Sequence, residues 1–144
     1  LEFRRVLFRS QHFVEHEKLN KKNIIMLYLT YPQRTWQDVC DIYQIYKKNL
    51  VKSLVCCERV KEHPYLMFYK NENNIKPIIE HQLYRRQDYP YCVKLSLYVG
   101  IYNCEEIKNL KDLLYNEETL FHEMKQEKVD VDYKEDYINL FEEK

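Results

Sequence analysis

The chain has 144 residues, and its 23 basic and 23 acidic side chains give a formal net charge of zero, so composition provides no general attraction for nucleic acid. Its longest apolar runs, such as IIMLYL, are far shorter than the ~20 residues that a membrane-spanning helix needs, and its single glycine, Gly100, excludes a glycine-rich phosphate loop. Five cysteines form no CxxC pair, which favours reduced thiols in a cytoplasmic protein, or a nuclear one in a eukaryote.

The first ten residues, LEFRRVLFRS, differ in composition from the segment that follows. Codon by codon, they can be read from a common short-read sequencing adapter, and ten matching residues are too many to be casual. We therefore interpret residues 1–10 as non-native and residues 11–144 as a partial domain. On this interpretation the natural protein extends upstream of Gln11, and one or more N-terminal strands are missing.

The next segments predict a strand, a helix and a second strand. QHFVEHEKLNKKN is typical of the end of a polar helix, and the apolar run NIIMLYLT indicates a strand buried on both faces of a parallel sheet. Residues 35–48 are expected to form an amphipathic helix, because Thr35 and Asp38 have the spacing of a capping box. VKSLVCCERV is the second strand. This order predicts an α/β fold with a right-handed βαβ unit and a parallel strand pair.

The middle of the chain predicts an antiparallel ribbon. Between residues 63 and 92, the short β-prone pieces LMFYK and IKPII flank a polar NENN turn. Several tyrosines in this segment would suit a protein interface.

The C-terminal part returns to alternating strands and helices. CVKLSLYVGIYN is expected to be a strand, and a helix is expected from Asn103 to about Leu114. A last strand should end in KVDVD. Residues 133–144 should form a final helix, with Tyr133, Tyr137 and Phe141 on one face.

Asp130 and Asp132 are candidate metal ligands. Carboxylates two residues apart at the end of a strand project to the same face, ~7 Å apart. This arrangement can hold Mg²⁺ beside nucleotide phosphates, since Mg²⁺ usually takes one or two protein carboxylates and completes its shell with water and substrate oxygens. The structural alternative is a helix start, with Asp132 as the N-cap and Glu135 reaching back from the first turn.

Two further candidates lie in the middle segment. Arg85 and Arg86 could clamp a carboxylate or a phosphate with planar guanidinium groups, or they could belong to a solvated loop. His63, directly before Pro64, is the other candidate, and its structural alternative is a turn residue.

In this order, several stretches resemble the acylneuraminate cytidylyltransferase family, which includes the CMP-sialic acid synthetases. The similar stretches are LYLTYPQRT, CERVKEHPYLMF, LYRRQDYP, GIYN and KVDVDYKEDY. The resemblance extends from Ile24 to the end of the chain. It implies a Rossmann-like α/β nucleotidyltransferase sheet with an inserted dimerisation ribbon, in which the hydroxyl of a nonulosonic acid attacks the α-phosphate of CTP and pyrophosphate leaves.

By matched position, the resemblance also implies roles for particular residues. Asp130 and Asp132 would bind Mg²⁺, and Arg86 would approach the sugar acid. Substrate contacts are implied for Arg34, Gln87, Tyr102 and Phe121. The expected partners are CTP, a nonulosonic acid and a second copy of the chain, with no nucleic acid and no membrane.

The sequence departs from the family pattern at positions that would touch substrate. Tyr28 stands where the family often has glutamine, and Leu66 where it often has lysine. The family's basic, glycine-rich N-terminal loop is absent, so we expect this chain to be inactive alone. Two alternatives remain open: a non-catalytic dimerising or binding module of the same fold, and an enzyme resembling the CMP-3-deoxy-octulosonate synthetases.

Overall fold

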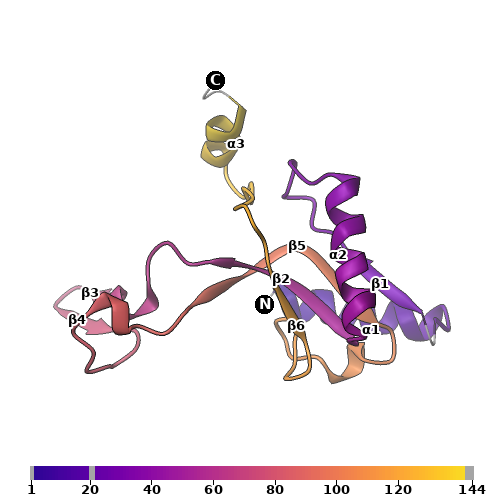
Figure 1. The fold of residues 1–144 in the computed structure, drawn as a ribbon, viewed down its shortest axis with the longest axis horizontal. Helices are drawn as coiled ribbons and strands as arrows, with labels where there is room; N and C mark the ends of the chain where they lie inside the picture. The colour runs from indigo at the N-terminus through magenta and orange to yellow at the C-terminus, as the bar shows by residue number, and fades with distance from the viewer. Residues whose placement is uncertain (1, 20–21, 142–144) are drawn as a thin grey trace.

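The structure is a computed structural model that describes residues 2–19 and 22–141. Its helices are α1 (Glu2–His16), α2 (Trp36–Asn49) and α3 (Lys134–Phe141), with short 3-10 helices η1 (Pro64–Leu66), η2 (Arg86–Asp88) and η3 (Ile107–Asn109). Its strands are β1 (Asn23–Met26), β2 (Ser53–Arg59), β3 (Phe68–Asn71), β4 (Asn74–Pro77), β5 (Val93–Asn103) and β6 (Leu120–Glu123). A central sheet carries α1 and α2, while an arm formed by residues 63–92 extends to one side (Figure 1).

The central sheet is mixed, with the strand order β1-β5-β2-β6. β5 runs antiparallel to both β1 and β2, and β6 runs parallel to β2. β1 and β2 therefore point the same way but are separated by β5, so the predicted hydrogen-bonded parallel pair is wrong. The 11-residue β5 pairs with β1 on one edge and with β2 on the other. It therefore lies beside β2, where the sequence predicted β1.

The prediction for NIIMLYLT is also only partly right. Only its first four residues lie in β1, where exposed and half-buried residues alternate. Leu29, in the loop that follows, is 96% exposed. β1 is thus a short strand at the edge of the sheet, and the strands with unbroken buried runs are β2 and β5.

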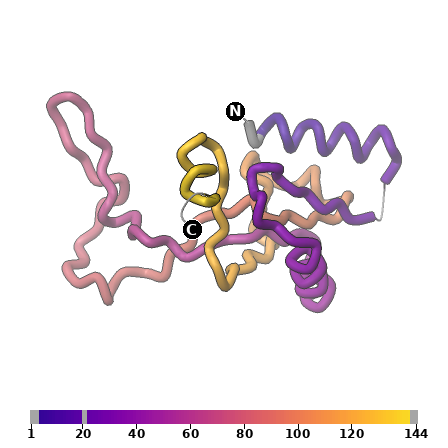
Figure 2. Tube along the Cα trace, turned by 90° about the horizontal axis from the view of Figure 1, so that it is seen from above, coloured from indigo at the N-terminus to yellow at the C-terminus, as the bar shows by residue number. Residues whose placement is uncertain are grey.

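Helices cover both faces of the central sheet, so the core has two parts. On one face, α2 packs Val39, Ile42 and Tyr46 against Leu54 and other residues of β2 and β5. On the other face, α1 and the η3 region pack against the opposite side of the same strands. Figure 2 shows α1 and α2 on opposite sides of the sheet.

Residues 2–10 belong to α1 in this fold, although their sequence suggests that they are non-native. Leu7 is 7% exposed and shares a core cluster with Val14 and Tyr102. The predicted helix end in residues 11–23 is confirmed as far as His16, where α1 ends.

Helix α2 forms as predicted. The Thr35 side chain accepts a hydrogen bond from the Asp38 backbone N–H, and the Asp38 carboxylate accepts one from the Thr35 backbone N–H. Burial raises the pKa of Asp38, but hydrogen bonds from Tyr98 and Thr35 outweigh burial and lower it to about 2. Asp38 therefore stays ionised at neutral pH and ties the start of α2 to β5 through the Tyr98 hydroxyl, 2.6 Å away.

The predicted antiparallel ribbon is confirmed as the hairpin of β3 and β4, with Asn71 opposite Asn74. The predicted helix from Asn103 to Leu114 is wrong, because only Ile107–Asn109 form a 3-10 turn. The buried Glu106 carboxylate accepts hydrogen bonds from the side-chain amides of Asn109 and Asn116, which ties this segment into a compact loop.

The last predicted strand is displaced. β6 ends at Glu123, before KVDVD, and the backbone N–H of Val131 donates to the carbonyl of Thr30 at 2.8 Å instead of joining the sheet. The final helix is confirmed over Lys134–Phe141, and its predicted end at 142–144 lies outside the described residues. Among the described residues, no helix has the length and apolarity to cross a membrane.

Candidate functional site

Asp130 and Asp132 line one cavity of about 450 Å³. The loop after β1 contributes Tyr28, Thr30 and Tyr31 to its wall, and β5 contributes Leu95 and Leu97. The two predicted metal ligands therefore share a cavity, although the strand expected to carry them is absent.

The Asp130 carboxylate faces the buried hydroxyl group of Tyr31. Tyr31 is 6% exposed, and its hydroxyl lies 3.4 Å from that of Ser96. Burial is the main cause that raises the pKa of Tyr31 to about 12, and the charge of Asp130 and a hydrogen bond to it add to this rise. Tyr31 is therefore a protonated donor at neutral pH, and it faces the carboxylate.

One carboxylate oxygen of Asp130, Oδ1, is buried and has no hydrogen-bond partner among the described residues. An uncompensated buried carboxylate oxygen is costly, and a cation is one group that would compensate it. Mg²⁺ needs only one or two protein carboxylates. The pair formed by Asp130 and Asp132 therefore fits this ion, although residues 2–19 and 22–141 contain no group of three or more potential metal ligands.

The hydrogen bonds at the start of α3 show whether Asp132 acts as the N-cap of this helix. The backbone N–H groups of Asp132 and Tyr133 donate to Oδ2 of Asp136, at 3.1 and 2.9 Å. With Asp132 as the N-cap, α3 would begin at Tyr133 and Glu135 would bond to the N-terminal backbone. Because α3 begins at Lys134, one residue later, Asp136 makes that bond instead.

Arg34 is not among the residues that line this cavity, but it contacts Tyr28 and Tyr31, which are. Its guanidinium donates to the backbone carbonyls of Tyr28 and Tyr98. The same group lies over the rings of Tyr31 and Tyr98, at 6.0 and 5.6 Å from the ring centroids. Arg34 therefore holds the loop after β1 against β5, so its position beside the cavity is fixed by several contacts.

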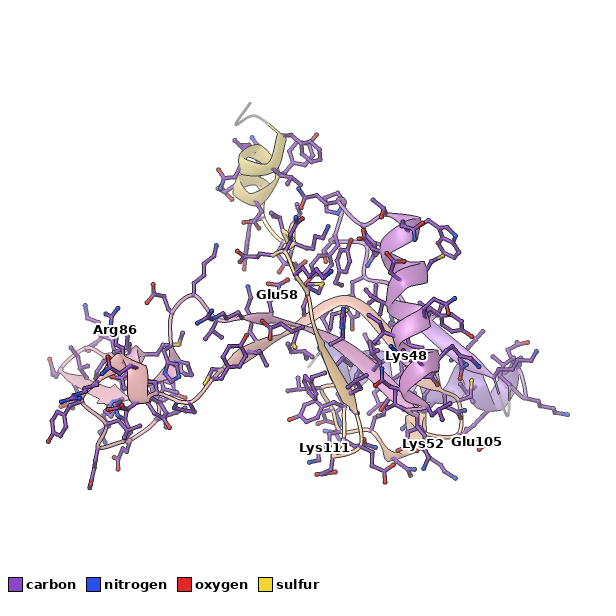
Figure 3. All side chains as sticks on the ribbon, viewed as in Figure 1. Lys48, Lys52, Glu58, Arg86, Glu105 and Lys111 are labelled. Carbon is purple, nitrogen blue, oxygen red and sulfur yellow. The ribbon has the colours of Figure 1, made fainter. Side chains whose placement is uncertain are left out.

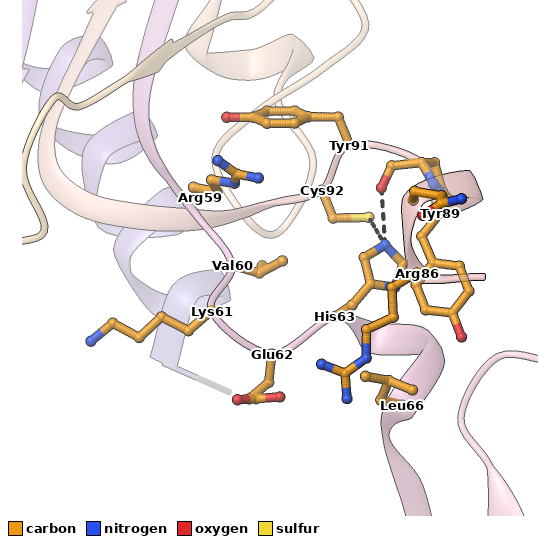
Figure 4. Close-up of a pocket in the computed structure, with 12 residues that line it drawn as sticks. Arg59, Val60, Lys61, Glu62, His63, Leu66, Arg86, Tyr89, Tyr91 and Cys92 are labelled. Atoms are coloured by element: carbon orange, nitrogen blue, oxygen red, sulfur yellow. Dashed lines mark hydrogen bonds between the residues drawn. The ribbon is translucent and has the colours of Figure 1, made fainter.

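Arg86 and Gln87 line a different cavity, of about 450 Å³, at the base of the arm (Figure 4). In Figure 4 the Arg86 guanidinium lies near the side chains of His63 and Leu66. Figure 3 shows Arg86 out on the arm and Glu58 on the central sheet. Within one chain, Arg86 and Gln87 therefore lie in a different cavity from Asp130 and Asp132.

His63 fixes the base of the arm. Its Nδ1 accepts a hydrogen bond from the Tyr65 backbone N–H, so in the neutral ring the hydrogen is on Nε2. Nε2 lies 2.9 Å from the carbonyl oxygen of Pro90 and 3.2 Å from Cys92 Sγ. This geometry agrees with a turn residue, the structural alternative for His63.

The remaining two predicted substrate contacts lie elsewhere. Tyr102 is 2% exposed in the core beneath α1, and burial is the main cause that raises its pKa. Phe121 is 40% exposed on β6, and its ring packs edge-on against Tyr115 at 5.5 Å. Neither residue lines the cavity of Asp130.

Sequence reasoning missed a network of ion pairs beside Asp130. Lys94 lies 3.1 Å from the buried carboxylate of Glu58 and 3.4 Å from Glu127, and Glu127 also pairs with Lys61 at 2.6 Å. Burial lowers the pKa of Lys94, but the carboxylates of Glu58 and Glu127 outweigh it and raise the pKa. No local motif links the paired residues, because each lies more than 30 positions from its partner in the sequence.

This network lines a second cavity, of about 520 Å³, which shares Tyr31, Leu95 and Asp130 with the first. The two cavities therefore meet at Asp130, and the segment 127–132 connects them. Together they give a mixed α/β protein a polar recess with carboxylate, ammonium and hydroxyl groups.

No protein-family model matches the chain, and no curated protein matches it at a significant level.

Proposed function

We propose that the chain is part of a CTP-dependent cytidylyltransferase that transfers CMP to a sialic-acid-like nonulosonic acid and releases pyrophosphate. The observation that carries this proposal is the buried, unpartnered Oδ1 of Asp130 in a cavity that also contains Asp132. The order of motifs that resemble the acylneuraminate cytidylyltransferase family supplies the substrate class.

In this proposal, Asp130 and Asp132 hold Mg²⁺, which neutralises phosphate charge and aligns the attacking and leaving oxygens. The Tyr31 hydroxyl, which also contacts Ser96, faces the Asp130 carboxylate. Arg34 fixes the loop that carries Tyr28 and Tyr31. The chain's own contribution is therefore positioning and charge, which are the main requirements of phosphoryl-type transfer.

A metal-binding comparison tests the proposal on this chain. Mn²⁺, a paramagnetic substitute for Mg²⁺, is titrated while the relaxation of water protons is measured. Asp130→Asn and Asp132→Asn should each weaken Mn²⁺ binding at least about tenfold, because each removes one of two charged ligands. Glu135→Gln, an exposed carboxylate in α3, is the matched control and should bind as the unmodified chain does.

In the parent enzyme that we propose, Asp132→Asn should also abolish Mg²⁺-dependent pyrophosphate release from CTP and sialic acid. Unchanged Mn²⁺ binding in both aspartate variants would contradict the proposal. The dimerising module without catalysis would then be the better interpretation of the fold.

We also propose that two copies of the chain associate through the arm. Cross-strand pairing places Phe68, Pro77 and Ile75 on one face of the hairpin, together with the stem of Lys70, and Tyr69 and Lys76 on the other. All residues of β3 and β4 are exposed, and an isolated two-stranded hairpin is marginal in water. A second copy would cover the apolar face and bring Arg86 and Gln87 of the arm to its neighbour.

Sedimentation equilibrium tests this association. The double variant Phe68→Asp/Ile75→Asp should sediment as a monomer at concentrations where the unmodified chain is a dimer, because two charges would be buried without partners. Tyr69→Asp/Lys76→Asp changes the opposite face of the hairpin and should leave the dimer intact. A dimer that tolerates the first variant would place the interface elsewhere.

A further inference from the structure

The exposed face of α1 carries two histidines one helical turn apart. His12 and His16 occupy positions i and i+4, so both side chains lie on the same face of the helix. Their rings are stacked, with 6.1 Å between centroids and 17° between planes. Both residues are exposed, which leaves the rings free to tilt toward a common ligand.

The chemistry of His16 is set by its neighbour Glu17. Oε1 of Glu17 lies 2.9 Å from Nδ1 of His16. An ionised carboxylate only accepts hydrogen bonds, so Nδ1 carries a hydrogen and the neutral ring presents the lone pair of Nε2 to solvent. A carboxylate on the second ring nitrogen is the usual partner of a metal-binding histidine, because it orients the ring and raises its basicity.

We propose that His12 and His16 together bind one divalent transition-metal ion of the Ni²⁺, Cu²⁺ and Zn²⁺ class, with water molecules completing its coordination. Neutral imidazole suits these ions, whereas Mg²⁺ prefers oxygen ligands. Two histidines at this helical spacing are a known arrangement for metal ligation. This inference does not depend on the proposed function, since no residue of α1 lines either cavity that contains Asp130.

The formal charges around this pair cancel. Arg9 and Lys18 repel a cation, while Glu15 and Glu17 attract one, and Glu17 is the charged group in contact with the pair through His16. Among the described residues no third histidine, cysteine or carboxylate completes a cluster here. We therefore infer a binding site with two protein ligands and no hydrolytic chemistry, although HFVEH also has an H-x-x-E-H spacing.

The other histidines are poor competitors for the metal. Both ring nitrogens of His63 and of His81 lie within hydrogen-bond distance of backbone groups. His122 lies half-buried on β6, where burial and the charge of Lys125 lower its pKa. His122→Gln is therefore a suitable control, because it removes one histidine without touching α1.

Isothermal titration of the untagged chain with NiCl₂ at pH 7.5 tests the proposal. We expect one Ni²⁺ per chain, with binding weakened at least about tenfold by His12→Gln or by His16→Gln. Glu17→Gln should weaken it by up to about tenfold, as the loss of an orienting carboxylate does. His122→Gln should leave the affinity unchanged, and MgCl₂ should not displace the bound Ni²⁺.

Proton competition provides a second readout. Imidazole binds metals only when it is neutral, so the Ni²⁺ heat should fall as the pH is lowered. Circular dichroism should show the same helix content in all variants, because the replaced side chains at positions 12 and 16 are exposed. Unchanged Ni²⁺ affinity in His12→Gln and His16→Gln would overturn the proposal, as would binding that is lost in His122→Gln.

Discussion

The variant Gly100→Ala is expected to have a free energy of unfolding about 1–3 kcal/mol lower than the unmodified chain, the usual cost of overpacking a core. A methyl group at position 100 would lie 2.5 Å from the hydroxyl oxygen of Tyr102 and 2.8 Å from its Cε2. Positions 100 and 102 share one face of β5, so the Tyr102 ring occupies the space above the glycine. That ring is 2% exposed beneath α1, and neighbouring core residues prevent it from moving aside.

Urea unfolding followed by circular dichroism measures this cost. The explanation requires that the loss of stability comes from the contact with the Tyr102 ring. Gly100→Ala should then lower the free energy of unfolding clearly less in a Tyr102→Leu background. The coupling energy in this double-mutant cycle should exceed ~0.5 kcal/mol. Additive effects of the two changes would contradict this explanation. They would leave the only glycine of the chain without a packing role.

Local signals in the sequence predicted the elements that local interactions stabilise. The capping box of Thr35 and Asp38 located the start of α2, and the polar NENN turn located the hairpin of β3 and β4. The pairing of β1 could not be predicted in this way, because its partner, β5, lies about 75 residues away in the sequence. Strand order depends on which strand is stabilised most by a central position in the sheet. Hydrophobic periodicity along the sequence does not report that stabilisation.

In the candidate site, too, the sequence predicted the residues that form a local motif but not the residues that come from distant parts of the chain. Asp130 and Asp132 were visible as a motif, but the alternating pattern of KVDVD also resembled a strand. In the structure this segment is held outside the sheet by Val131 and by the ion pairs of Glu127. Tyr31 and Ser96, which line one cavity together with Asp130, are 65 positions apart and have no recognisable spacing.

Replacing Lys94 by methionine is expected to affect both stability and metal binding. Glu58 is 4% exposed, and without Lys94 its carboxylate would keep only a long contact of 3.5 Å from the Lys128 backbone N–H. We expect the free energy of unfolding to fall by about 1–3 kcal/mol, less than the ~3–5 kcal/mol for a fully buried pair, because the Lys94 side chain is 53% exposed. Urea unfolding measures this change.

Lys94 also pairs with Glu127, three residues before Asp130. In Lys94→Met, Glu127 keeps its ion pair with Lys61 but loses the one with Lys94, so the variant should loosen the carboxylate segment and weaken Mn²⁺ binding as well. The double variant Lys94→Met/Glu58→Met separates the two effects. Removing both charges should restore most of the stability, since an apolar pair of similar volume often replaces a buried ion pair without loss. It should not restore Mn²⁺ affinity, because Glu127 still lacks Lys94. If the double variant binds Mn²⁺ as the unmodified chain does, Lys94 contributes to stability alone, and the orientation of Asp130 depends on Tyr31 and Ser96.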